Sequence, residues 1–116
     1  MFVPRITPEG VAQEIACRML GTWAVSLNDI LKAFESFPAM YRIMKVLLNP
    51  APGQFISSQD LNTAMTELLS ELNRKTDNNL NLNPMQRAIL KSTNQVFVSM
   101  VYGSIISDLR IVAIHP

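Results

Sequence analysis

Glu67 and Glu71 are two carboxylates whose spacing could do chemistry in this 116-residue chain. They lie four residues apart in a stretch with the apolar period of a helix, so both would occupy one helix face. Such a pair could ligate a metal ion or serve as the acid and base of a catalytic site. Because no histidine or third acid joins them at ligand spacing, we expect a solvated face, with Glu71 paired to Lys75 at i,i+4.

The remaining reactive side chains are isolated in the sequence. The one histidine, His115, stands beside the last residue, where a side chain is hard to position for catalysis. The one cysteine, Cys17, has no partner for an internal disulfide and lies among apolar residues, so we expect a small core residue. The sequence has no glycine-rich phosphate loop, zinc-ligand spacing or serine elbow. We therefore expect no enzyme: no catalytic residue, no cofactor, no bound metal and no small-molecule substrate.

Length predicts a single domain over residues 1–116, large enough to bury a core without disulfides or metal. Charged residues make up 16% of the chain, against a usual value of about 25%, so little of its surface is built only for water. Ten Lys and Arg balance nine Asp and Glu, and no basic run exceeds Arg74-Lys75. Nucleic-acid-binding proteins normally show a clustered basic face, so nucleic acid is not the expected partner.

No segment of the sequence is expected to direct the chain into a membrane. The first six residues lack the charged start and continuous apolar run of a secretory signal. The uncharged segment from Ser92 to Ser107 is shorter than the roughly 20 residues that a spanning helix needs, and charged residues close it. We therefore expect a chain that starts in the cytoplasm and has no transmembrane helix.

The longest apolar stretch of the sequence covers residues 83–114. Asn83 can cap a helix there, Pro84 suits the first helical position, and Gln86 completes a capping box. Apolar residues then occupy every face of the predicted helix. A helix that is apolar all round must be buried all round, so we expect the rest of the molecule or a partner to cover it.

A narrow strip of small residues marks one side of this predicted helix. Ser99, Gly103 and Ser107 recur every four residues and would let a second backbone approach closely. The cover could come from the rest of a small bundle, or from other copies or a partner protein, because a short chain has few other helices. We expect a protein interface comprising Ser99, Gly103, Ser107, Phe97, Val101, Tyr102, Ile105 and Ile106.

Capping residues and prolines divide the rest of the chain into shorter helices. Thr7, Ser26 and Ser57 are each placed to cap, and Asp60 extends the Ser57 cap into a capping box. Trp23 continues the apolar stripe of the first segment, so we expect it in the core. The predicted helices cover residues 8–24, 27–36, 38–48 and 57–72, with loops at 49–53 and 73–83.

Together these patterns predict an all-α fold, a small bundle of four to five helices with a long apolar C-terminal helix. Two points stay open: whether Val96–Val101 is helix or strand, and whether residues 111–114 form a short strand, alone or with another chain. We expect a non-enzymatic assembly or adaptor subunit that binds a protein partner or itself, as a homo-oligomer. The alternative is a small helical regulator that binds nucleic acid or a nucleic-acid enzyme.

The polar connector that ends in Leu82-Asn83-Pro84, with a helix on either side, resembles the C-terminal hairpins of type III secretion needle and inner-rod subunits. The likeness covers this hairpin alone, and the first half of the chain has no counterpart in that pattern. The resemblance therefore implies no family membership, but it shows one class of assembly to which a chain of this kind could belong.

Overall fold

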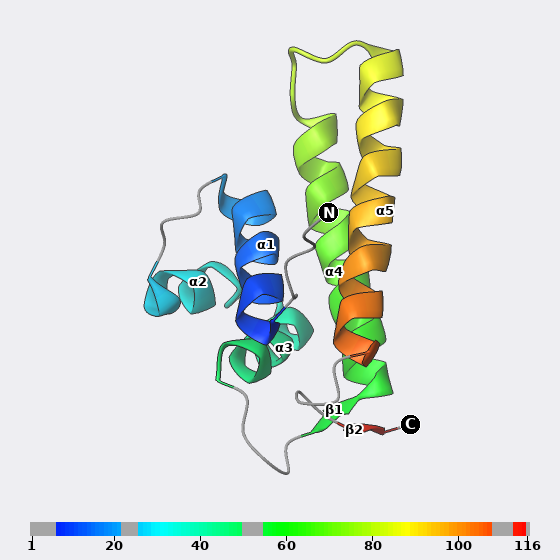
Figure 1. The fold of residues 1–116 in the computed structure, drawn as a ribbon. Helices are drawn as coiled ribbons and strands as arrows, with labels where there is room; N and C mark the ends of the chain where they lie inside the picture. Colours follow the sequence, from blue (N-terminus) through cyan, green and yellow to red (C-terminus); the bar gives the residue numbers. More distant parts are fainter. Residues whose placement is uncertain (1–6, 22–25, 50–54, 108–112, 116) are drawn as a thin grey trace, which may run out of the picture.

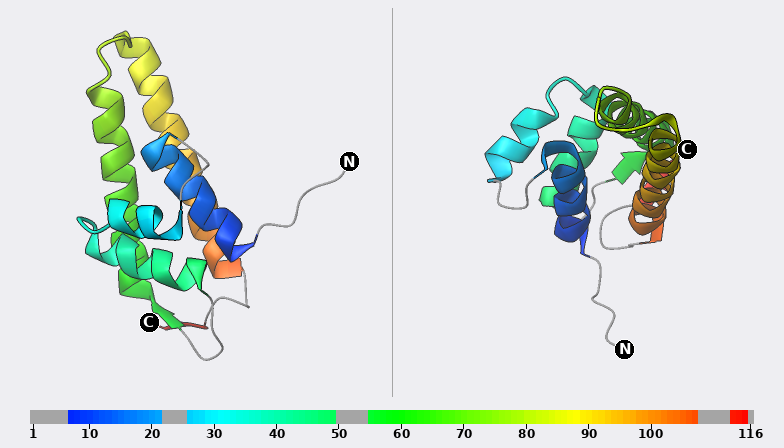
Figure 2. Two further views of the ribbon diagram at one scale, coloured as in Figure 1. Left: turned by 90° about the vertical axis from the view of Figure 1, so that its left-hand side faces the viewer. Right: turned by 90° about the horizontal axis from the view of Figure 1, so that it is seen from above.

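The computed structural model describes residues 7–21, 26–49, 55–107 and 113–115. Within these ranges the chain is an all-α bundle, as predicted, in which α4 and α5 form a long hairpin beside α1–α3 (Figure 1). The closed end of the hairpin extends beyond the other three helices (Figure 2). The elements are α1 (Pro8–Leu20), α2 (Leu27–Ala33), α3 (Pro38–Leu48), β1 (Phe55–Ser57), α4 (Ser58–Asp77), α5 (Pro84–Ser107) and β2 (Ala113–His115).

Local caps set most of the helix starts where the sequence predicts them. Three predicted helix ends are wrong, because α1 ends at Leu20, α2 at Ala33 and α4 at Asp77. At α5, Asn83 and Gln86 form both bonds of a capping box, with N···O distances of 2.8 and 2.9 Å. Gly21 ends α1 in the left-handed conformation, at φ 74°, so the first apolar stretch divides here. The side-chain oxygens that cap the other helices belong to Thr7 for α1, Ser26 for α2 and Ser57 for α4.

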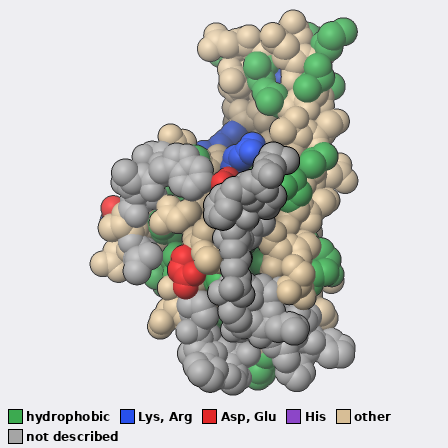
Figure 3. All heavy atoms as spheres, in the orientation of Figure 1, with side chains coloured by type: hydrophobic (Ala, Val, Ile, Leu, Met, Phe, Trp, Pro, Cys, Tyr) green, Lys and Arg blue, Asp and Glu red, His purple; other side chains and the backbone are tan. Residues whose placement is uncertain are grey.

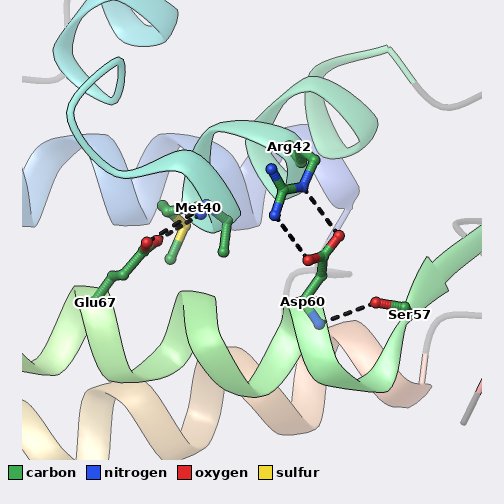
Figure 4. A network of polar contacts seen from close by, with 6 residues as sticks. Met40, Arg42, Ser57, Asp60 and Glu67 are labelled. Carbon is green, nitrogen blue, oxygen red and sulfur yellow. Dashed lines mark hydrogen bonds and ion pairs between the residues drawn. The ribbon is translucent and has the colours of Figure 1, made fainter.

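The N-terminus of α3 is capped by another helix. Its N-cap residue, Phe37, has no capping side chain, and Pro38 occupies the first position. Glu67 of α4 reaches this end, where its Oε1 accepts the Met40 N–H at 2.8 Å and its Oε2 accepts the Ala39 N–H at 3.4 Å (Figure 4). The expectation that Glu67 only faces solvent is therefore wrong, because its carboxylate satisfies donors that α3 leaves free.

A second contact joins the same two helices, two residues after Met40 on α3 and about two turns before Glu67 on α4. Arg42 of α3 donates to both carboxylate oxygens of Asp60, at 3.0 and 2.8 Å (Figure 4). These hydrogen bonds stabilise the carboxylate and hold the pKa of Asp60 below its ordinary value. The predicted capping box at Ser57 is thus confirmed for the Ser57 cap, whereas the Asp60 side chain turns to Arg42.

Further along α4, the predicted pair of Glu71 with Lys75 is wrong. Glu71 accepts from Arg74, with an Nε···Oε2 distance of 2.9 Å, and this contact lowers the pKa of Glu71. Lys75 instead donates from Nζ to the carbonyl of Met19 in the last turn of α1. A cation at that end of a helix also complements the helix dipole.

One core joins all five helices, and its largest enclosed side chains include Phe34, Met40 and Leu61. Helix α5 is helical through Val96–Val101, which answers the open question about that segment.

The expectation that α5 is buried all round is wrong for the single chain, because its neighbours cover only one side. Cys17 is half-buried and lies outside the core, contrary to the prediction.

The short strands pair within the chain. β1 and β2 run parallel, with Phe55 opposite Ala113 and Ser57 opposite His115. The terminal strand left open from the sequence is therefore present at residues 113–115, where it pairs with the segment that precedes α4. Three other predictions concern residues outside the described ranges: the first part of the terminal strand (residues 111 and 112), the core position of Trp23, and most of the predicted loop (residues 50–53).

Polar contacts join α4 to α5 in the half of the hairpin that is nearer its connecting loop. The Asn94 amide donates to Asn73 Oδ1 at 3.1 Å and to Thr76 Oγ1 at 3.0 Å. Near the loop, Lys91 pairs with Asp77 at 2.7 Å. These contacts fix the side that α5 turns toward α4, and so they fix which side it turns away.

Glu67→Ala should destabilise the fold, because it leaves the first N–H groups of α3 without their cap. We expect the free energy of unfolding, measured in urea at neutral pH, to fall by about 1 kcal/mol. Glu67→Gln is the matched control, since it keeps the length and an acceptor oxygen, and it should lose less. Equal stability of wild type and Glu67→Ala would show that the contact does not hold α3.

Stability should depend on pH through Asp60. A carboxyl group whose pKa is depressed by folding stabilises the folded state above its unfolded pKa, and this contribution is lost as pH falls through the folded pKa. Asp60→Asn should therefore be less stable than wild type at neutral pH, and the two should converge in acid once the pH falls below the folded pKa of Asp60. A difference in urea midpoint that persists unchanged in acid would rule out the ionised pair as its cause.

Candidate interaction surface

The outward side of α5 exposes large apolar side chains along nearly its whole length. Met85 is 74% exposed, Ile89 and Val96 are each 59% exposed, and Met100 is 63% exposed. At 100° per residue all four fall within one sector of the helix, on the side away from Ile105. Figure 3 shows hydrophobic side chains recurring along the edge of the molecule that α5 forms. Isolated exposed apolar residues are ordinary, whereas four on one helix face make this side of α5 a candidate contact surface.

This outward side carries no charge. The two charged residues of α5 are Arg87 and Lys91, and both engage the hairpin. Arg87 donates to the carbonyl of Leu82 at 3.1 Å, while Lys91 forms its ion pair with Asp77. The outward side of α5 is therefore a strip of apolar and small polar residues. We call it the α5 surface, comprising Met85, Ile89, Ser92, Val96, Ser99, Met100 and Gly103.

The structure divides the interface predicted from the sequence into two groups. Phe97, Val101 and Ile105 belong to the core of the chain itself, so their assignment to a partner interface is corrected. They face inward because, after the hairpin loop, α5 runs back along α4 with this side against the bundle. The other members remain at the surface: Ser99, Tyr102, Ile106 and Ser107 are exposed, and Gly103 is partly exposed.

The strip of small residues is open in the single chain. Apart from the neighbouring residues and the backbone of α5 itself, no heavy atom of the described residues lies within 4 Å of the position that a Cβ would take at Gly103. The space beside Gly103 is therefore open, which is what the close approach of a second backbone would require.

A groove between α1 and α5 borders the α5 surface. Its volume is about 580 Å³, and Val96 and Met100 line it from α5 while Val11 lines it from α1. Arg18 of α1 lies over the Phe97 ring, with its guanidinium carbon 4.6 Å from the ring centroid. The groove widens the apolar area beside the middle of α5, because Val96 and Met100 belong to both features.

The described residues offer little for other kinds of chemistry. Among them, no group of three or more histidine, cysteine or acidic side chains could hold a metal ion. No helix within the described ranges is long and apolar enough to cross a membrane. Three basic side chains in the same ranges, Arg42, Arg74 and Lys91, are paired with carboxylates.

The sequence prediction missed the exposed row itself. Met85, Ile89, Val96 and Met100 share one predicted helix face, so the periodicity contained the signal. The row was missed because every face of this helix was expected to be covered by the bundle or by a partner. The side of α5 that the fold would cover depends on where α4 packs, which the spacing along α5 alone does not indicate.

The inner and outer sides of α5 should respond differently to truncation. Ile105 is 1% exposed, and Ile105→Ala should lower the free energy of unfolding by about 2–5 kcal/mol. Met100→Ala, on the outer side, should change it by less than about 0.5 kcal/mol at a protein concentration low enough to limit association. Comparable losses in urea denaturation would mean that the chain covers the outer side itself.

Comparisons of the chain with protein-family models, with curated proteins and with solved structures find no match. Among the described residues, the α5 surface is the feature that bears on function, through its exposed apolar side chains, its lack of charge and the open space at Gly103.

Proposed function

We propose that the chain is a non-enzymatic helical subunit that assembles through protein–protein contacts made by the α5 surface. The observation that supports this most is the row of four exposed apolar side chains on an uncharged helix face. Burying one large apolar side chain contributes roughly 1.5–3 kcal/mol, so covering this row would contribute several. Association costs on the order of 4–15 kcal/mol, so the row is a substantial part of what binding requires.

An assembly role also fits how the charges of the bundle are used. Arg42, Asp60 and Glu67 join α3 to α4, and Lys75 joins α4 to α1. These groups stabilise the fold, and none of them lies on the α5 surface. The alternative of a helical regulator that binds nucleic acid would need free cations on one face, and no specific contact supports it.

Gly103→Leu should block assembly while leaving the fold intact. The added side chain fills the open strip where a partner backbone would approach, and leucine favours a helix more than glycine does. We expect light scattering over about a hundredfold range of concentration to show association of the wild type and a smaller mass for the variant. Circular dichroism should show unchanged helix content.

Ser70→Leu is the matched control for that variant. Ser70 is exposed on α4, on the side opposite its buried residues, so the same side chain is added away from the α5 surface. This control should associate as the wild type does. Normal association of Gly103→Leu, or a wild type that stays monomeric and binds no other protein through this face, would overturn the proposal.

A further inference from the structure

We infer that the partner of the α5 surface is a second copy of the chain, with the two α5 helices antiparallel about a two-fold axis between Ser92 and Val96. This inference rests on the proposed function and deepens it, since it names the occupant and the register. A two-fold contact uses the same surface twice, so the surface must be complementary to itself. Both the spacing and the order of residue sizes along α5 meet this requirement.

The spacing along the α5 surface is that of a coiled-coil seam. Its residues follow one another at intervals of four, three, four, three and four, a mean close to the 3.5 residues of a heptad repeat. The first five are exposed, and the sixth is the partly exposed glycine with open space around it. A seam with this period packs against a second helix over its full length. The seam residues are Met85, Ile89, Ser92, Val96, Ser99 and Gly103.

Residue size determines the direction of the pairing. Large side chains occupy mainly the first half of the seam, and small ones mainly the second half. In an antiparallel pair centred between Ser92 and Val96, each layer joins one large residue to one small residue. These layers are Met85 with Gly103, Ile89 with Ser99, and Val96 with Ser92.

A parallel pair would be packed unevenly. Gly103 would then face Gly103 and Ser99 would face Ser99, which leaves voids at one end of the seam. At the other end Met85 would face Met85. Matched layers of similar total volume avoid both faults, so the antiparallel arrangement fills the interface better.

Charge does not oppose this arrangement. In many coiled coils, charged residues beside the seam determine which orientation forms. Here the flanking residues are uncharged, so size is the property that remains to select one orientation. These flanking residues are Gln86, Ala88, Thr93, Gln95, Met100 and Tyr102.

Disulfide trapping tests the register directly. In a Cys17→Ser background, Met85→Cys and Gly103→Cys are made in separate chains that carry different tags. Facing cysteines link when their Cβ atoms lie roughly 3.5–4.5 Å apart. We expect the mixed chains to form a disulfide-linked heterodimer, while each variant alone stays unlinked. A mixture of Met85→Cys with Ser70→Cys is the control and should also stay unlinked.

The outcomes separate this inference from the proposed function. Linked homodimers of either single variant would indicate parallel helices and overturn the antiparallel register. Association of the cysteine-free background by light scattering, without the heterodimer, would overturn the register and leave the assembly proposal standing. A background chain that stays monomeric would overturn the second copy as the partner, and capture of a different protein by the α5 surface would then support the assembly proposal alone.

Discussion

The carboxylate of Glu67 at the N-terminus of α3 is the contact on which the arrangement of the helices depends. Helix α3 begins at a proline and has no capping side chain of its own, so its free N–H groups need an acceptor from elsewhere. Helix α4 supplies that acceptor, and two turns further along it supplies Lys75 to the opposite end of α1. One helix therefore places an acid at the positive end of one neighbour and a base at the negative end of another.

The packing around α4 also determines which side of α5 is covered. Helices α1 and α3 contact α4, and the polar contacts of Asn94 and Lys91 hold α5 against α4 along a different line. Helix α5 consequently packs through one side, the side of Val98, Val101 and Ile105. The opposite side keeps its apolar residues in solvent. The residue composition that suggests a core helix therefore leaves a row of apolar side chains exposed on α5.

Features of the fold that depend on neighbouring residues could be predicted from the sequence. The caps at Thr7, Ser26, Ser57 and Asn83 are local, because each joins residues three apart in the chain. Contacts between distant segments could not be predicted in this way. Glu67 and Met40 are 27 residues apart, and the parallel pairing of β1 with β2 joins segments from opposite halves of the chain.

The candidate surface was predictable in part, because helical spacing is a local property of the sequence whereas the covering of a helix face is not. Helical spacing placed Ser99 and Gly103 on one strip, and the structure keeps that strip open. Spacing also grouped Met85 and Val96, but whether a helix face is covered depends on how many neighbours the helix has. Phe97 lies in the core for this reason, although its type and position suited a partner interface equally well.

Oxidation of the native methionines tests the central claim that the α5 surface is covered by association. Met85 and Met100 are exposed in the single chain, whereas Met40 and Met44 are only 1% and 0% exposed and serve as internal references. Peroxide oxidation of each methionine can be followed by mass spectrometry in dilute and concentrated protein. We predict that Met85 and Met100 react more slowly as concentration rises, while Met40 and Met44 stay slow throughout. Rates at Met85 and Met100 that do not change with concentration would contradict self-association through this surface.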